Sequence, residues 1–147
     1  MQPFTLDIAD ADIADLRARL ARPRWPEPLP GTQGWEKGTP VAAALQWAEA
    51  LADFDWRALR EEVNALPQFI AEIDGTTIHL IHARSDRADA VPLLMLHGWP
   101  GTAVELIDLI GPLTDPASPD EPAFHVVIPS HPGVGLSGRT SETWGVP

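Results

Sequence analysis

The sequence predicts an α/β protein in which a helical, proline-rich segment precedes the first strands of a mixed sheet. Up to Pro67, apolar residues recur every three to four positions, which is the period of a helix; after it they form short runs typical of strands. Two such runs, residues 91–96 and 124–129, enclose a helical pattern over residues 102–113 and so predict a βαβ unit. We therefore divide the chain into a helical segment, residues 1–67, and a sheet region, residues 68–147.

The N-terminal segment is predicted to form three helices, each preceded by a residue that commonly caps helices. They cover residues 11–21 after Asp10, residues 40–52 after Thr39 and residues 56–66 after Asp55. The residues on their apolar faces are expected in the core: Leu45, Leu51, Trp56, Leu59 and Val63.

A stretch rich in proline and glycine separates the first two helices. Prolines lack an N–H and have a fixed φ, so residues 23–40 are not expected to form a helix or a central strand. Trp25 and Trp35 lie in this stretch, and free linkers seldom contain indole side chains. We expect the stretch to be ordered by packing.

The sheet region begins with a predicted hairpin. Residues 68–73 and 76–82 are rich in strand-forming residues, and Asp74-Gly75 between them is a strong two-residue turn signal. The continuous apolar run over residues 91–96 is typical of a strand buried on both faces. With so few strands, the predicted sheet is incomplete.

Composition excludes several classes of function. The 147 residues include 10 basic and 21 acidic residues, and the net charge of -11 is a poor match for nucleic acid or an anionic membrane surface. The absence of cysteine excludes disulfides and thiolate catalysis. No apolar run is long enough to span a membrane and no signal peptide is recognisable, so we expect a cytoplasmic location.

The first candidate for chemistry is the turn His97-Gly98-Trp99-Pro100-Gly101, which follows a predicted strand. The carboxyl edge of an open α/β sheet is where such folds place their sites. Two glycines and a proline force a sharp turn, which can leave a backbone N–H free to stabilise an oxyanion. The same residues are also compatible with an ordinary strand-to-helix turn in which Trp99 packs. The Trp99–Pro100 bond is a candidate cis peptide.

This turn resembles the oxyanion-loop motif of epoxide hydrolases of the α/β-hydrolase superfamily. Residues 126–137 resemble the next loop of that family, P-S-x-P-G-x-G-x-S, although Val134 and Leu136 stand where aromatic residues are usual. The upstream half is similar to the N-terminal region of the microsomal and juvenile-hormone subgroup. The matching pieces are residues 15–20, Arg24-Trp25-Pro26, Asp55-Trp56-Arg57, Ile73-Asp74-Gly75 and Ile78-His79.

The resemblance implies a mechanism without a cofactor or metal. In this family an Asp opens a small-molecule epoxide and forms an ester, a His oriented by an acid activates water to cleave it, and lid tyrosines polarise the epoxide oxygen. It implies that the Trp99 N–H is one of two oxyanion donors and that the Trp99 ring lines the substrate pocket. It also implies that the N-terminal segment wraps around the hydrolase domain.

Most of that machinery is missing from these residues. The chain has no tyrosine and no G-x-[SD]-x-G elbow between a strand and a helix. We expect the nucleophile, acid and base to lie beyond Pro147 and this chain alone to be inactive. A C-terminal part or a second chain is expected to complete the sheet.

Two alternatives remain open. The elbow could carry Ser, as in an esterase, or belong to a dehalogenase-like relative; or the chain could be a non-catalytic interaction module. Gly133 to Gly138 matches G-x-G-x-x-G but lacks the following helix and acid of a dinucleotide site. Ser130 and Ser137 are expected to form turn hydrogen bonds and not to act as nucleophiles.

The histidines are interpreted as structural. His79 and His82 lie three apart in a predicted strand and therefore face opposite sides. His97 is expected to stabilise its turn through a hydrogen bond. His125 and His131 have no carboxylate neighbours at a spacing typical of metal ligands.

Overall fold

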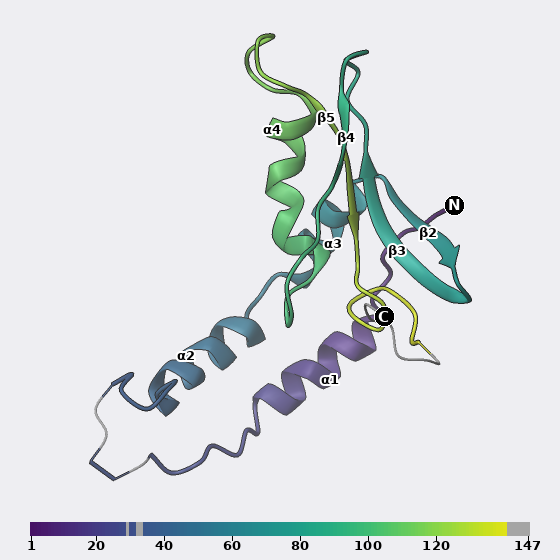
Figure 1. The fold of residues 1–147 in the computed structure, drawn as a ribbon. Coiled ribbons are helices and arrows are strands. Elements are labelled where there is room, and N and C mark those ends of the chain that lie inside the picture. The colour runs from purple at the N-terminus through teal and green to yellow at the C-terminus, as the bar shows by residue number, and fades with distance from the viewer. Residues whose placement is uncertain (29, 32–33, 141–147) are drawn as a thin grey trace. The chain divides into compact units, whose positions relative to one another are not determined.

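The computed structural model describes residues 1–28, 30–31 and 34–140. Its elements, in chain order, are β1 (Gln2–Pro3), α1 (Asp10–Leu20), α2 (Val41–Ala52), α3 (Trp56–Asn64), β2 (Gln68–Ile73), β3 (Thr76–Ala83), β4 (Val91–Leu94), the 3-10 helix η1 (Ala103–Leu109), α4 (Ile110–Thr114) and β5 (Phe124–Pro129) (Figure 1). No helix among the described residues is long and apolar enough to cross a membrane.

Packing divides the chain into two units that we describe separately. One consists of residues 7–59; the other joins Met1–Leu6 to residues 60–147. Residues 1–6 belong to the second unit because β1 pairs with β2 and the Phe4 N–H donates to the Gln68 carbonyl (2.9 Å). The predicted division after residue 67 rests on the change of hydrophobic period and not on packing, and it stays a prediction.

The first unit is built on α1 and α2, which pack against each other. The Arg17 Nε donates to the Ala52 carbonyl at the end of α2 (3.0 Å). Helix α1 begins at Asp10, one residue before its predicted start, and Ala9 is its capping residue without a side-chain bond. Asp10 and Asp12 lie in the first turn, where their negative charges interact favourably with the positive end of the helix dipole and stabilise the helix. The cap predicted for the third helix is confirmed, because Asp55 Oδ1 accepts from the Ala58 N–H (3.0 Å).

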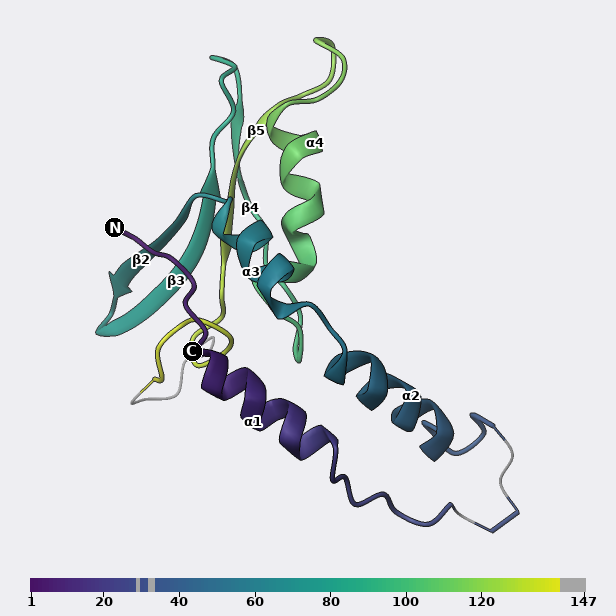
Figure 2. The same ribbon diagram turned by 180° about the vertical axis from the view of Figure 1, so that it is seen from behind.

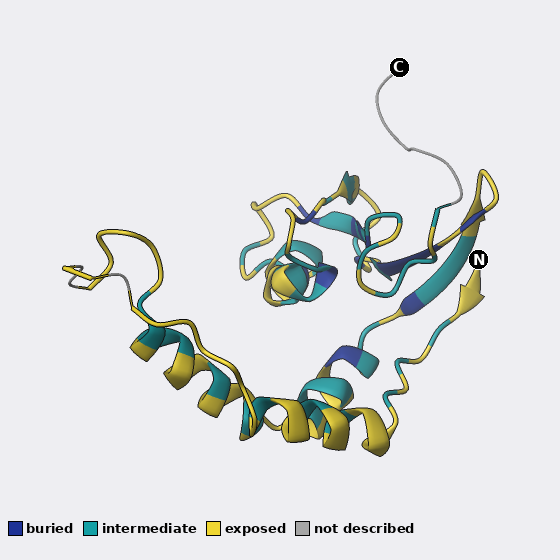
Figure 3. Cartoon of the chain, turned by 90° about the horizontal axis from the view of Figure 1, so that it is seen from below, coloured by how far each residue is buried: buried dark blue, intermediate teal, exposed yellow. Residues whose placement is uncertain are grey.

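The expectation that the apolar faces of these helices form a core is wrong in part. Neither α1 nor α2 contains a buried residue (Figure 3), and Leu45 and Leu51 are exposed. Two packed helices leave the outer flanks of each apolar stripe uncovered. Trp56 and Leu59 are half-buried, and only Val63, which belongs to the second unit, is fully buried.

The proline-rich stretch contacts α2 through its second tryptophan. The Trp35 and Trp47 rings lie 6.0 Å apart, in the range of a favourable aromatic pair. Both rings remain exposed, as does Trp25. Residues 29 and 32–33 of this stretch lie outside the described residues.

The second unit contains a mixed five-stranded sheet of order β1-β2-β3-β5-β4. The predicted hairpin is confirmed: β2 and β3 pair antiparallel, and Asp74 and Gly75 both have positive φ (48° and 73°), as a two-residue hairpin turn requires. The βαβ unit is also confirmed, since β4 and β5 are parallel neighbours on either side of η1 and α4. Strand β1 was not predicted, because two residues carry no detectable period.

The core of this unit lies between the sheet and the helix of the βαβ unit. Ile81 pairs with Ile128 and Ala83 with Val126, so all four side chains point to one face, where Ile110 packs on them. Figures 1 and 2 show α4 beside β4 and β5 on that side of the sheet. Burying an Ile or Val side chain contributes about 1.5–3 kcal/mol.

Strand β4 differs from its prediction. It is the last strand of the described sheet, and Leu94 and Leu96 are 61% and 59% exposed, so the expectation that this run is buried on both faces is wrong. A continuous apolar run is typical of a strand that is covered on both faces. Among the described residues β4 pairs with β5 alone, and its apolar side chains are therefore left partly uncovered.

The helix predicted over residues 102–113 is a 3-10 helix followed by one short α-helix. Pro112 lies in the first turn of α4, where the missing N–H would have no acceptor inside the helix. In a continuous α-helix over residues 102–113, residue 112 would donate its N–H to the Asp108 carbonyl. Proline has no N–H, so that hydrogen bond would be missing.

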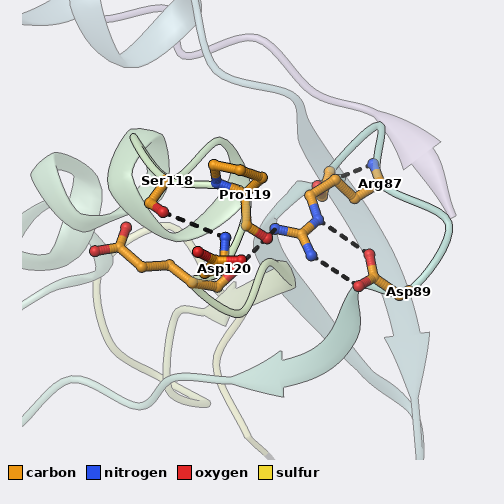
Figure 4. A network of polar contacts seen from close by, with 7 residues as sticks. Arg87, Asp89, Ser118, Pro119 and Asp120 are labelled. Atoms are coloured by element: carbon orange, nitrogen blue, oxygen red, sulfur yellow. Dashed lines mark hydrogen bonds and ion pairs between the residues drawn. The ribbon is translucent and has the colours of Figure 1, made fainter.

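Arg87 joins the two loops at the amino ends of β4 and β5. Its guanidinium donates to the carbonyls of Pro119 (3.1 Å) and Glu121 (2.7 Å) and pairs with both oxygens of Asp89 (2.7 and 3.0 Å; Figure 4). The hydrogen bond from Arg87 lowers the pKa of the Asp89 carboxyl. These contacts hold the end of the sheet opposite the 97–101 turn.

Candidate functional site

The carboxyl ends of β4 and β5 bring two loops together. Because these strands are parallel neighbours, residues 97–101 after β4 and residues 130–138 after β5 emerge at the same edge of the sheet. The turn predicted from the sequence therefore lies where an open α/β sheet places its chemistry.

Within the turn, the backbone of Trp99 is free to bind a ligand. Its N–H has no hydrogen-bond acceptor among residues 1–28, 30–31 and 34–140, and the residue is 84% exposed. The Trp99–Pro100 peptide is cis, as the sequence suggested. A backbone donor that is already oriented and unused is what stabilisation of an oxyanion needs.

The glycines of the turn differ in their surroundings. A Cβ on Gly98 would meet no atom within 4 Å apart from its chain neighbours, so the space beside the Gly98 Cα is open. At Gly101 a Cβ would collide with the Glu105 carboxylate, which lies over the turn from the first residues of η1. Gly101 thus permits the close approach of that side chain to the backbone.

His97 is buried beneath the turn, 5% exposed, and bonds with both loops. Its Nδ1 lies 2.9 Å from the Gly98 carbonyl, and its Nε2 accepts from the His131 N–H (3.2 Å). In return His131 Nε2 lies 2.6 Å from the His97 carbonyl, and the two rings are 4.2 Å apart. The expectation that His97 stabilises the turn by a hydrogen bond is confirmed. The contact with His131 was not predicted, although its place two residues after a predicted strand was a usable signal.

The second loop is attached to β3 by the two serines. Ser137 Oγ accepts from the His79 N–H (3.0 Å) and donates to the Ser130 carbonyl (2.8 Å). The Ser130 N–H donates to the His79 carbonyl (2.8 Å). The predicted turn hydrogen bond is confirmed for Ser137, whereas the Ser130 hydroxyl bonds the His79 ring on β3 and not its own turn.

His79 is the centre of a buried polar chain and is 1% exposed. Gln68 Nε2 donates to the Val63 carbonyl (2.9 Å) and the Asn64 side chain (3.2 Å), so its Oε1 is left to accept from His79 Nε2 (3.0 Å). His79 Nδ1 is then unprotonated and accepts from the Ser130 hydroxyl (2.9 Å). His79 is therefore a structural histidine, as predicted.

We expect His79 to make stability depend on pH. Burial lowers the pKa of His79 below its ordinary value of about 6.5, so the folded protein keeps this ring neutral. The unfolded chain binds a proton at His79 below about pH 6.5. The contribution of His79 to stability is therefore complete above that pH, and it is lost as the pH falls through the folded pKa. Urea denaturation midpoints of the protein and of His79→Gln, at about pH 7.5 and at about pH 5.5, measure this contribution. The two values lie on either side of the pH at which an unperturbed imidazole titrates. The advantage of the native residue should shrink at the lower pH; an equal difference at both would contradict the prediction.

The described residues offer no evident metal centre. No three His, Asp or Glu side chains among them lie in a group that could hold a metal ion.

Comparison with known proteins shows to which family this chain belongs. The family model described as "Epoxide hydrolase N terminus" matches residues 1–106. The chain belongs to the epoxide hydrolase N-terminal family. A putative epoxide hydrolase of Stigmatella aurantiaca is 38% identical over 97% of the chain, and epoxide hydrolase 1 of Oryctolagus cuniculus is 35% identical over the same share. The chain spans about a third of each relative (33%).

Solved structures agree with the family. The epoxide hydrolase of Aspergillus niger is 33% identical, with a TM-score of 0.82 over 97% of this chain and 38% of that one. The juvenile hormone epoxide hydrolase of Bombyx mori is 27% identical, with a TM-score of 0.85 over 96% of this chain and 34% of that one. The resemblance to epoxide hydrolases and the α/β class with its mixed sheet are confirmed. The role of the 97–101 turn stays a prediction.

Proposed function

We propose that the protein carrying this chain hydrolyses epoxides to vicinal diols through an ester on a carboxylate, and that this chain supplies one oxyanion donor, the Trp99 N–H. The observation that carries the proposal is the unused Trp99 N–H at the carboxyl edge of β4, in a chain of the epoxide hydrolase family. The activity belongs to the whole protein, since the chain spans about a third of its relatives.

The proposed chemistry has two steps. A carboxylate oxygen attacks an epoxide carbon, a C–O bond of the ring breaks, and the released oxygen takes a proton, which leaves a hydroxy ester. Water then adds to the ester carbonyl with loss of a proton to a base, and the resulting oxyanion collapses to release the diol and restore the carboxylate. The Trp99 N–H stabilises that oxyanion, and the exposed Trp99 ring forms part of the wall around the substrate.

The other groups must come from outside these residues. The chain has no tyrosine to polarise the epoxide oxygen, and the described sheet ends at β4 with exposed apolar residues. An unpaired edge strand with exposed Leu94 and Leu96 favours pairing with a further strand. We propose that a C-terminal part of the same protein, or a second chain, supplies that strand and the nucleophile.

A single turnover in H₂¹⁸O tests the proposal. The protein is produced from its own gene with any sequence that follows residue 147. It is mixed with styrene oxide, with the protein in molar excess over the epoxide. We expect phenylethanediol without label, because the oxygen added to the substrate comes from the carboxylate and the labelled water oxygen enters the protein. Label in the diol would mean direct attack by water. Hydrolysis of p-nitrophenyl acetate without any diol formation would favour an esterase.

A further inference from the structure

We infer that His131 is a positioning residue for the Trp99 N–H, acting through His97. The role of His131 in catalysis rests on the proposed function, whereas the contacts between His131 and His97 do not depend on it. His131 lies on the loop after β5 and His97 on the turn after β4, so the contact joins two segments 34 positions apart in sequence.

The protons of the His97 ring follow from its partners. The His131 backbone N–H can only donate, so His97 Nε2, 3.2 Å away, is unprotonated. A neutral imidazole then carries its proton on Nδ1, which faces the Gly98 carbonyl at 2.9 Å. The backbone N–H of residue 131 therefore selects the tautomer in which His97 donates to Gly98, whichever side chain that residue carries.

That bond sets the direction of the Trp99 N–H. The Gly98 carbonyl and the Trp99 N–H belong to the same planar trans peptide, and so they point in opposite directions. Holding the carbonyl toward the buried His97 ring turns the N–H away from it. The N–H has no acceptor among the described residues, so nothing else there orients it.

The His131 side chain makes a second contact with the turn. Its Nε2, 2.6 Å from the His97 carbonyl, must carry a proton and donate to it. The peptide before Gly98 is thereby fixed as well, and the two successive peptides that lead to Trp99 each have a bonded carbonyl. Free rotation of either would swing the Trp99 N–H away from the oxyanion.

Spectroscopy of the histidine rings tests the geometry without any need for activity. In the protein produced from its own gene and labelled with ¹⁵N-histidine, long-range ¹H–¹⁵N correlation should show His97 protonated at Nδ1 and not at Nε2. In His131→Phe, which keeps a ring and the backbone N–H but loses the side-chain donor to the His97 carbonyl, the Trp99 amide resonance should shift or broaden. In His131→Gln, which keeps a side-chain donor, it should stay near its native position. A proton on His97 Nε2, or equal changes in both variants, would overturn the inference.

Kinetics test the positioning role. We expect His131→Phe to lower kcat for styrene oxide about 3- to 10-fold, the effect of one hydrogen bond on ester hydrolysis, with kcat/KM nearly unchanged because formation of the ester does not use the oxyanion donor. His131→Gln should recover most of kcat. Equal losses in both variants, or a change in KM alone, would overturn the role. If the unsubstituted protein forms no diol, the proposed function fails, and the ring spectrum alone then decides the inference.

Discussion

An ester in place of the amide at Trp99 is expected to lower kcat for epoxide hydrolysis about 10²- to 10³-fold, the usual cost of one oxyanion donor. Incorporating the α-hydroxy acid that corresponds to tryptophan keeps the indole ring, removes the N–H and makes the Gly98 carbonyl a weaker acceptor for His97. The ester intermediate should accumulate, because its hydrolysis passes through the oxyanion whereas its formation does not. Single-turnover kinetics with rapid acid quench would separate the two steps.

Trp99→Phe is the matched control for this experiment. It retains the backbone N–H and changes only the exposed ring, so its main effect should be on KM and on the choice of substrate. If the amide-to-ester variant hydrolysed its intermediate at the native rate, Trp99 would not be an oxyanion donor, and the turn would only connect β4 to η1.

Replacing His79 by Leu is expected to destabilise the protein by about 1–3 kcal/mol for each of the two buried groups it leaves unpaired. These groups are Gln68 Oε1 and the Ser130 hydroxyl, both of which bond the His79 ring. Leu fills similar space, so the loss reflects missing hydrogen bonds and not a cavity. Urea denaturation at neutral pH measures the free energy of unfolding.

His79→Gln provides the comparison for this variant. A Gln side chain can donate to Gln68 and accept from Ser130, so it should retain a substantial part of the stability. If the Leu variant were as stable as the Gln variant, the polar chain from Asn64 to Ser130 would contribute nothing to folding, and packing on Phe4 would account for the burial of His79.

Local patterns predicted the elements of this protein well where a few neighbouring residues decide the conformation. Asp74-Gly75 requires positive φ at two positions, which only a short list of residues tolerates, and the hairpin appears as predicted. The cap at Asp55 and the strand over residues 124–129 were recognised for similar reasons. Pro112 is the local signal against a continuous helix over residues 102–113, because proline has no N–H to donate.

Predictions of burial were less successful, because burial depends on what lies beside an element. The run that became β4 is as apolar as β5, yet β5 lies between two strands while β4 is the last strand of the described sheet. Likewise α2 has an apolar face, but within its unit it packs only in part, so Leu45 and Leu51 stay exposed. A hydrophobic period shows which side of an element would be buried, and not whether a partner is present.

By itself the sequence determined the α/β class, the family and the position of the 97–101 turn, because each depends on residue order along a short segment. Only the tertiary structure decided that His131 bonds His97, that His79 links Gln68 to Ser130, and that the Trp99 N–H has no acceptor among the described residues. These contacts join residues up to 51 positions apart, and they depend on the parallel and antiparallel registers that bring β3, β4 and β5 together. Hydrogen-bond geometry of that kind is set by strand pairing, which no local pattern in one sequence contains.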